Sequence, residues 1–367
     1  MRIFPCPQRA GGYEKKENCM KKEMKVAVMN GVGKMGFERR PVPVPKDDEA
    51  LVKLEYVGIC GSDLHYYEEG RIGNYIVQPP FVLGHEPGGT VVAVGKNVKN
   101  VKVGDRVALE PGKTCGHCEF CKQGKYNLCP DVVFFATPPV DGVFCEYVAH
   151  EAALCFKLPD TVSTMEGALI EPLAVGFHAA MQGGAKFGQK ALVTGAGCIG
   201  LVTAMALKAM GVSEVYVSDV LPARLQKAKE LGATVVINSK EEDLQKRIAE
   251  LTGGQGVDLA VDTSGNEIAV NGAIECVKKG ANIVLVGYSR SGMMNLAISR
   301  ALDKEVTFKT VFRYRHVYPL AIQAVAEGKI NLKGIVSDVF ELDDIQTAMD
   351  RSVQEKAKIV KAVVHIG

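Results

Sequence analysis

The sequence predicts an α/β protein with two parts, an antiparallel β-rich part and a doubly wound parallel sheet. Three observations predict this organisation. Between residues 25 and about 159, short β-type runs are broken by glycine and proline, which is typical of antiparallel, loop-rich structure. Between residues 190 and 310, apolar strands alternate with amphipathic helices, which is typical of a parallel sheet. The last segment, 310–367, mixes both types, and we expect it to complete the first part.

The predicted elements follow from this pattern in chain order. The β-type runs of the first part are residues 26–29, 50–57, 88–94, 106–109, 143–148 and 154–157. The second part alternates strands 190–194, 214–219, 235–237, 257–262 and 281–286 with helices 198–210, 222–231, 241–251 and 266–277. The last segment has a predicted helix at 319–327 and β-type runs at 329–340 and 358–366.

The overall charge is nearly balanced. The chain has 44 basic and 42 acidic residues, a net charge of +2 and a pI of about 7.9. This balance favours neither a nucleic-acid nor a membrane partner and makes a small molecule the expected ligand. The longest apolar stretches are shorter than the roughly 20 residues that a membrane helix needs. We therefore expect a soluble, cytoplasmic protein.

Residues 1–23 carry no hydrophobic region and no periodic pattern. They fit neither a secretory signal nor a transit helix, so we expect a disordered N-terminal extension. Two of the six cysteines outside the candidate sites, Cys6 and Cys19, belong to it. The other four, Cys145, Cys155, Cys198 and Cys276, are expected to be small reduced residues, as in cytosolic proteins.

Four further cysteines stand together in one loop that is rich in glycine and lysine. Cys115, Cys118, Cys121 and Cys129 form the pattern C-x2-C-x2-C-x7-C, which can surround one tetrahedral zinc ion. The alternative is a disulfide cluster, but a chain that buries a large core has little need of such cross-links. Because four thiolates leave no coordination position for a substrate, we expect a structural zinc site.

Two segments match the dinucleotide fingerprint G-x-G-x-x-G. The first, residues 31–36, is followed by Pro41, Pro43 and Pro45. Proline cannot stand in a helix interior, whereas a phosphate cradle needs a helix that begins at the glycines. We therefore expect a tight turn at residues 31–36.

The second match, Gly195 to Gly200, follows an apolar strand and begins a helix without proline. Gly195 permits the turn, Gly197 lets a pyrophosphate approach, and Gly200 permits close packing of helix and strand. Nineteen residues later a strand ends in Asp219, whose carboxylate can bind the ribose hydroxyls and repel a 2′-phosphate. The cofactor is therefore expected to be NAD rather than NADP, with Arg224 as a residue that could soften this preference.

A second metal site is indicated by Cys60, His85 and Glu86. A thiolate, an imidazole and a carboxylate are typical ligands of a zinc ion that keeps one position open for substrate. Glu171 adds an acid at the start of an otherwise apolar helix, where an unpaired carboxylate would be costly. Adjacent residues of an extended chain point to opposite faces, so His85 and Glu86 can share one ion only if the backbone bends there.

Taken in this order, these motifs resemble those of the zinc-dependent medium-chain dehydrogenases, and within them the sorbitol (L-iditol) and xylitol dehydrogenases. The resemblance covers residues 24–367. It includes three further stretches, 70–75, 134–139 and 312–314.

The resemblance implies a GroES-like catalytic domain made of residues 24–172 and 311–367, which carries a structural zinc lobe at about 111–130. It implies a Rossmann NAD-binding domain at 173–310, and an oligomer, commonly a tetramer. The catalytic zinc would be held by Cys60, His85 and a glutamate, with the choice between Glu86 and Glu171 left open. Asp63 would orient these ligands.

The resemblance also assigns further residues by role. Ser62 and His65 would relay the proton through the cofactor ribose, or water held by Glu86 or Glu171 would carry it. Cofactor contacts would include Gly195, Gly197, Ile199, Gly200, Asp219, Arg224, Val286, Phe312 and Arg313. Substrate contacts would include Tyr66, Tyr67, Phe135, Glu171, Arg313 and Tyr314.

The reaction that the resemblance implies is oxidation of a polyol to a ketose with hydride transfer to NAD. Arg315 and His316 depart from the residues common in animal members, which leaves the preferred polyol open. A threonine- or butanediol-type dehydrogenase is the alternative within the enzyme class. A zinc-ribbon interaction protein is the alternative outside it, and it fits poorly with the second set of metal-binding residues.

Overall fold

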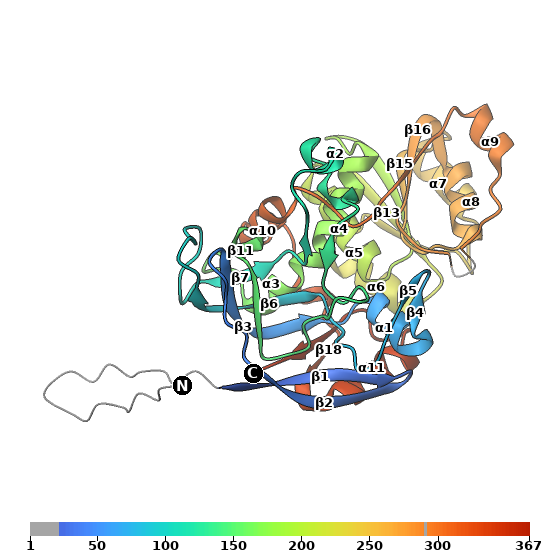
Figure 1. Cartoon of the computed structure of the whole chain (residues 1–367). Coiled ribbons are helices and arrows are strands. Elements are labelled where there is room, and N and C mark those ends of the chain that lie inside the picture. Colours follow the sequence, from blue (N-terminus) through green and yellow to red (C-terminus); the bar gives the residue numbers. More distant parts are fainter. Residues whose placement is uncertain (1–21, 290–291) are drawn as a thin grey trace, which may run out of the picture.

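The computed structural model describes residues 22–289 and 292–367, which form two main β-sheets with helices between and around them (Figure 1). Most of the predicted extension, including Cys6 and Cys19, lies outside the described residues. Only its last two residues, 22 and 23, are described. Strand β1 (Glu23–Gly31) begins at Glu23, so this residue belongs to a strand and not to an extension.

The first main sheet has seven strands. Its order is β11-β7-β6-β3-β19-β18, with β10 paired to β3. The bounds are β3 (Glu49–Gly58), β6 (Glu86–Val94), β7 (Arg106–Leu109), β10 (Tyr147–Glu151), β11 (Cys155–Lys157), β18 (Asp338–Glu341) and β19 (Ala362–His365). Strand β19 pairs antiparallel with β3, so the end of the chain completes the first part as predicted (Figure 1).

The first glycine fingerprint forms the turn of a hairpin. Strand β1 pairs antiparallel with β2 (Lys34–Pro41), and Gly33 has a φ of +71° at the turn between them. The prediction of a tight turn at residues 31–36 is confirmed. Two further short strand pairs complete the β-rich part: β4 (Arg71–Ile72) with β5 (Tyr75–Ile76), and β8 (Gly112–Lys113) with β9 (Val133–Phe134).

The second main sheet has six strands, all parallel, in the order β14-β13-β12-β15-β16-β17. This order, with its reversal at β12, is that of a doubly wound dinucleotide-binding sheet. The bounds are β12 (Lys190–Thr194), β13 (Glu214–Asp219), β14 (Val235–Asn238), β15 (Val257–Asp262), β16 (Val277–Leu285) and β17 (Thr307–Thr310). The predicted fold class is confirmed.

The helices are α1 (Gly61–Glu69), α2 (Glu119–Lys122), α3 (Thr164–Ala168), α4 (Ile170–Gly183), α5 (Cys198–Ala209), α6 (Pro222–Glu230), α7 (Leu244–Thr252), α8 (Glu267–Cys276), α9 (Ile298–Asp303), α10 (Tyr318–Ala326) and α11 (Ile345–Gln354). The predicted β-type run 329–340 is wrong over most of its length, because residues 333–335 form a single 3-10 turn before β18. Helix α11 was not predicted, although its buried residues Ile345, Ala348, Met349 and Ser352 have helical spacing.

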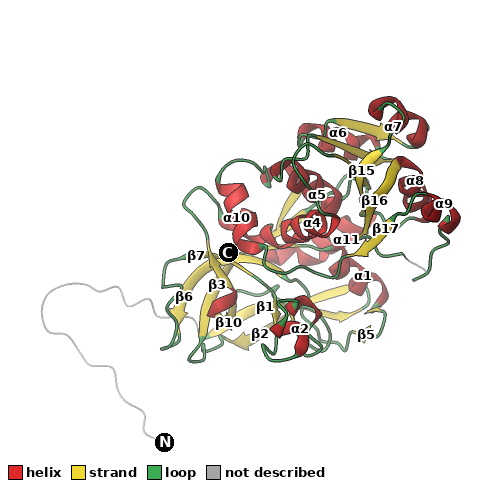
Figure 2. Cartoon of the chain, turned by 90° about the horizontal axis from the view of Figure 1, so that it is seen from above, coloured by secondary structure: helices red, strands yellow, loops and turns green. Residues whose placement is uncertain are grey.

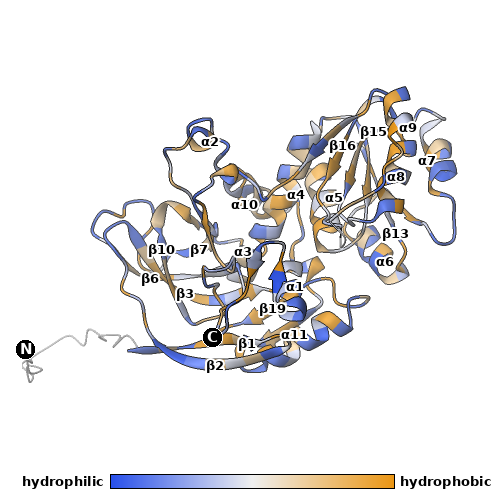
Figure 3. Ribbon diagram, turned by 45° about the vertical axis from the view of Figure 1, so that its right-hand side comes forward, coloured by the Kyte–Doolittle hydropathy of each residue, from blue (hydrophilic) through white to orange (hydrophobic). Residues whose placement is uncertain are grey.

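Helix α4 joins the two parts. It lies between the sheets (Figure 2) and contributes Leu173 and Phe177 to a core that also includes strand residues of both sheets. Gly176 permits this packing against α5, because a Cβ there would lie 2.8 Å from the backbone of Val202. The inner strands carry the apolar residues (Figure 3). As a result, the first turn of α4, with Glu171, is fixed beside both parts.

Within the described residues, no helix has both the length and the apolar character that a membrane crossing requires.

Candidate active site

Cys60 stands at the N-terminal end of helix α1, where Asp63 holds it. The Cys60 backbone N–H donates to Asp63 Oδ2 at 2.9 Å, and the Gly84 N–H donates to Asp63 Oδ1 at 2.9 Å. Asp63 is fully buried. One carboxylate therefore ties the loop that carries Cys60 to the loop that carries His85.

His85 and Glu86 reach the same point because the backbone bends just before them. Gly84 has a φ of +89°, and β6 begins only at Glu86, so the alternation of an extended strand does not separate the two side chains. Asp63 Oδ1 lies 3.6 Å from His85 Nδ1. One ligand atom from each of Cys60, His85 and Glu86 lies within 4.8 Å of the others. The bend that shared binding requires is present.

Glu86 has a cationic partner that the sequence did not reveal. Lys361 Nζ donates to Glu86 Oε1 at 2.7 Å and to the Ile59 carbonyl at 2.9 Å, and both side chains are buried. Burial alone would lower the pKa of Lys361, but the Glu86 carboxylate raises it, so the lysine is charged. Gly58 makes room for the pair, because a Cβ there would lie 1.9 Å from Glu86 Oε2.

Glu171 lies beside this group without belonging to it. Its Oε1 accepts a hydrogen bond of 2.8 Å from the Tyr314 hydroxyl. Burial, helped by the nearby Glu86 carboxylate and opposed by His85, raises the pKa of Glu171 to about 7. The two glutamates, left unranked from sequence, are thus distinguished: Glu86 faces Cys60 and His85 directly, whereas Glu171 is held one step away by Tyr314.

Arg313 presents an unsatisfied donor in the same region. Its guanidinium carbon lies 3.9 Å from the ring centre of Phe134 and 4.9 Å from that of Phe312. Nη1 is buried and has no hydrogen-bond partner among the described residues. A buried donor without a partner is costly, so a ligand oxygen is a natural partner for it.

Phe134 takes the place that was predicted for Phe135. The Phe134 ring lies 5.8 Å from the His85 ring, whereas Phe135 packs on His150 at 4.7 Å. The prediction of Phe135 as a wall residue is therefore not supported. Strand β9 ends at Phe134, and the Phe135 side chain beyond it contacts His150 and not His85.

Tyr66 and Tyr67, both predicted as substrate contacts, differ in where their hydroxyl groups lie. Burial raises the pKa of Tyr66 to about 12, and Asp63, His85 and Arg313 act on its hydroxyl electrostatically, which places it near the site. The Tyr67 hydroxyl instead donates to Asp350 Oδ1 at 2.6 Å and lies 2.9 Å from the Gly33 carbonyl oxygen. Its hydroxyl is thus engaged with the β1–β2 hairpin and α11, so the predicted substrate contact of Tyr67 is not supported.

Ser62 and His65 both lie on α1, two and five residues beyond Cys60. Ser62 is half-buried in the first turn. The His65 side chain is 41% exposed, and its Nε2 lies 3.1 Å from Glu69 Oε2. His65 therefore has direct access to solvent.

The second glycine fingerprint forms a cradle at the start of α5. Gly195 has a φ of +95°, and a Cβ at Gly200 would lie 1.8 Å from the Gly195 carbonyl, so both positions require glycine. At Gly197, by contrast, a Cβ would meet only Arg224 Nη1 at 3.9 Å. No side chain caps this end of α5. The space over Gly197 and the free N–H groups fit a pyrophosphate.

Asp219 ends β13 beside this cradle. Its Oδ2 accepts a hydrogen bond of 2.6 Å from the Ala196 N–H. Arg224 donates from Nη2 to the Lys356 carbonyl, and its Nε is buried without a partner among the described residues. The other predicted cofactor residues follow the carboxyl ends of strands in the parallel sheet. They are Ile199 in the first turn of α5, Val286 just after β16, and Phe312 and Arg313 after β17.

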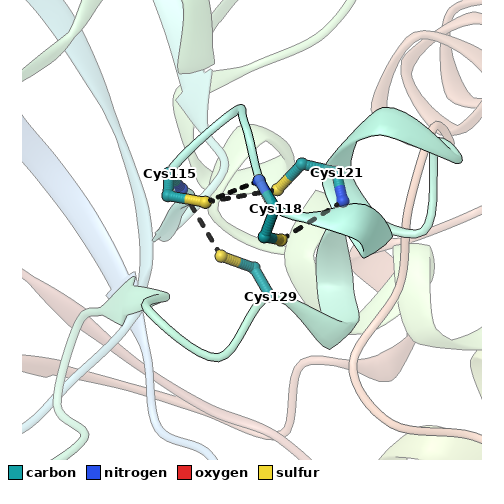
Figure 4. Close-up of side chains that lie close together, drawn as sticks. All are labelled: Cys115, Cys118, Cys121 and Cys129. Carbon is teal, nitrogen blue, oxygen red and sulfur yellow. Dashed lines mark hydrogen bonds between the residues drawn. The ribbon is translucent and has the colours of Figure 1, made fainter.

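The four-cysteine lobe is closed and contains no disulfide (Figure 4). The ligand atoms of Cys115, Cys118, Cys121 and Cys129 all lie within 4.8 Å of one another. The sulfurs of Cys115 and Cys121 are 4.0 Å apart, close to the roughly 3.8 Å that a tetrahedral zinc site gives and far from a bonded pair. Backbone N–H groups donate to three of the sulfurs. The residues fit one zinc ion.

Two protein-family models match the chain. The alcohol dehydrogenase GroES-like domain matches residues 46–160, and the zinc-binding dehydrogenase model matches residues 198–327. The chain belongs to the zinc-dependent medium-chain dehydrogenases. The predicted family is confirmed, and zinc and NAD are its typical cofactors.

Relatives within this family extend over nearly the whole chain. The sorbitol dehydrogenase of Bacillus subtilis is 45% identical and covers 93% of this chain and 97% of its own. Human sorbitol dehydrogenase is 46% identical, with coverages of 88% and 91%. A crystal structure of an Escherichia coli oxidoreductase of unknown specificity has a TM-score of 0.90 at 44% identity, covering 94% of this chain and 99% of that one. Within this family, the chain is similar to sorbitol dehydrogenases over most of its length.

Proposed function

We propose that this enzyme oxidises a secondary alcohol of a polyol, such as sorbitol or xylitol, to the corresponding ketose. The carbon loses a hydride to NAD and the hydroxyl loses a proton to solvent, which balances the reaction. One observation carries the proposal: the convergent donors Cys60, His85 and Glu86 lie beside the polar groups of Arg313 and Tyr314. The similarity to sorbitol dehydrogenases supports it.

Cys60, His85 and Glu86 would hold a zinc ion. Three protein ligands leave one position open, as catalytic zinc sites do. Asp63 would fix the His85 ring through Nδ1 and leave Nε2 for the metal. When bound, zinc favours loss of the alcohol proton. Glu171, held by Tyr314, would accept a hydrogen bond from a water or from the substrate.

Arg313 and Tyr66 would recognise the other hydroxyls of the polyol. The unpartnered Nη1 of Arg313 gains a hydrogen bond only from a ligand with a second oxygen. A site built in this way rejects analogues that lack the hydroxyl much more strongly than an apolar pocket would. The proton would leave by way of Ser62 and the cofactor ribose to the exposed His65, or by way of water beside Glu171.

Several broader assignments accompany this function. We assign residues 24–172 and 311–367 to a catalytic domain, residues 173–310 to a cofactor domain, and the four-cysteine lobe to a structural zinc. We also propose a homo-oligomer, commonly a tetramer in this family. Large exposed apolar side chains near the β17 edge, at Tyr288, Met293, Ile298 and Leu302, support it. The nine unpaired cysteines among the described residues support a cytoplasmic location.

Asp219→Ala should change the cofactor preference. The substitution removes the carboxylate that would bind the ribose hydroxyls and repel a 2′-phosphate. We expect kcat/KM for NAD to fall about tenfold or more, because one charged hydrogen bond to the cofactor is lost. The ratio of kcat/KM for NAD to kcat/KM for NADP should fall as well. Steady-state kinetics with both cofactors measure this. Glu230→Ala, an exposed carboxylate on α6, is the control, and an unchanged ratio in the Asp219 variant would contradict the assignment.

A substrate panel tests the function itself. Sorbitol, xylitol and galactitol are compared with threonine and 2,3-butanediol at saturating NAD, and kcat/KM is measured from NADH absorbance. We expect one of the polyols to give the highest value. A higher value for threonine or 2,3-butanediol would replace the polyol assignment by the other secondary-alcohol type.

A further inference from the structure

The segment between β17 and α10 carries the two polar residues that face the candidate site, yet it has no regular structure of its own. Arg313 and His316 in this segment have φ values of +55° and +56°. Residues other than glycine occupy this left-handed region only when their surroundings hold them there. The contacts that hold residues 312–316 therefore determine where Arg313 and Tyr314 point.

Those contacts come from the four-cysteine lobe. Asn127 Nδ2 donates to the Phe312 carbonyl at 2.8 Å, and Asn127 Oδ1 accepts from Arg315 Nη1 at 2.9 Å. Asn127 is buried and stands two residues before the zinc ligand Cys129. One lobe side chain thus binds the segment on both sides of Arg313 and Tyr314.

His316 adds a second attachment. Its backbone N–H donates to the Tyr126 hydroxyl at 2.8 Å, and its Nε2 lies 2.8 Å from the Gly124 carbonyl. The two rings meet edge to face at 4.8 Å. The Tyr126 hydroxyl itself donates to the buried Glu110 at 2.8 Å, so the lobe side of this contact is also fixed.

The space between lobe and segment is nearly filled. A cavity of about 10 Å³, room for a single water, is lined by Glu110, Asn127, Phe134, Arg313 and Tyr314. A displacement of the lobe would therefore move Arg313 and Tyr314, since little free volume separates them.

We propose that the zinc lobe is a positioning element for substrate recognition, in which Asn127 and Tyr126 fix Arg313 against the substrate hydroxyls and Tyr314 against Glu171. This proposal rests on the proposed function. It makes the lobe, through Asn127, a determinant of affinity for polyhydroxylated substrates and not only of stability. Asn127 touches neither metal nor substrate in this account and acts through the segment 312–316.

The test compares the wild type, Asn127→Leu and Leu128→Ala with the polyol favoured by the wild type and with 2-butanol, which has no second hydroxyl. Leucine has nearly the shape of asparagine and removes both hydrogen bonds. Leu128 stands in the same turn with an exposed side chain and serves as the control. Zinc content and thermal midpoint are measured for each protein.

For Asn127→Leu we expect KM for the polyol to rise about tenfold, with kcat and the KM for 2-butanol changed less than about threefold. Zinc content should equal that of the wild type, and Leu128→Ala should behave as the wild type. Equal losses on both alcohols, or an unchanged polyol KM, would overturn the proposal while the proposed function stands. A wild type that oxidises no polyol would overturn both.

If Asn127→Leu does not fold, Arg315→Met takes its place. It removes only the bond to Asn127 Oδ1, and the same selective rise in polyol KM is expected, smaller in size. An equal effect on both alcohols would again overturn the proposal.

Discussion

Cys60→Ser should abolish turnover and leave cofactor binding intact. Serine is a poor zinc ligand at neutral pH, so the group of Cys60, His85 and Glu86 loses its thiolate. Metal assistance supplies several kcal/mol of transition-state stabilisation, and about 1.4 kcal/mol corresponds to a factor of ten. We therefore expect kcat to fall about a thousandfold or more, measured with the favoured polyol at saturating NAD.

Cofactor binding provides the internal check on this variant. The cradle at Gly195–Gly200 belongs to another part of the chain, so the Kd for NADH from fluorescence titration should change less than about threefold. Cys145→Ser is the matched control. That thiol is buried, donates to the Tyr147 carbonyl at 3.3 Å, and can be replaced by a hydroxyl in the same bond. Near wild-type turnover in Cys60→Ser would remove Cys60 from the metal site.

Lys361→Met should destabilise the metal-free protein strongly. It leaves Glu86 buried without its cation, and breaking a buried ion pair from one side costs about 3–5 kcal/mol. Zinc at the same carboxylate compensates the charge, so the loss should be smaller in the zinc-bound protein. Removal of the nearby positive charge should also slow zinc release. Urea unfolding with and without zinc, and zinc transfer to a chelator, measure the two effects.

Two variants separate charge from packing at this position. Lys361→Arg keeps the positive charge and should lose less stability than Lys361→Met. The double variant Glu86→Gln with Lys361→Met removes both charges and should recover part of the stability that Lys361→Met loses. Equal losses in zinc-free and zinc-bound Lys361→Met would show that Lys361 does not act through Glu86.

The elements with strong periodicity could be predicted from the sequence. Strands β12, β13 and β15 have the predicted bounds, because buried parallel strands read as continuous apolar runs between glycines and charged residues. Strand β7 of the antiparallel sheet also has its predicted bounds. Strand β17 could not be predicted in this way. It is the edge of its sheet, and only Phe308 of its four residues Thr307–Thr310 is apolar, so hydrophobicity gives little signal.

The donors of the candidate metal site could be named from sequence, whereas their relative positions could not. Cys60 and His85 stand in recognisable sequence motifs. The bend at Gly84 that lets Glu86 join them is a property of the backbone conformation. The choice between Glu86 and Glu171 depended on Tyr314, which lies 143 residues from Glu171 in the chain.

Long-range partners were missed for the same reason. Lys361 pairs with Glu86 across 275 residues, and Asn127 reaches Phe312 across 185. No local pattern marks either residue. Phe134 lies near the site where Phe135 was predicted, and of Tyr66 and Tyr67 only Tyr66 lies there. In both cases the outcome depends on the direction in which each side chain leaves the backbone. A difference of one residue decides this in a strand or a helix.

The zinc content of the purified enzyme tests the central claim most directly. Elemental analysis of fully active wild type should find two zinc ions per chain, one for each group of convergent donors, and Cys60→Ser should retain only one. Loss of turnover should follow loss of the second ion. Full activity on a polyol with a single zinc per chain, held by the four cysteines, would contradict the account.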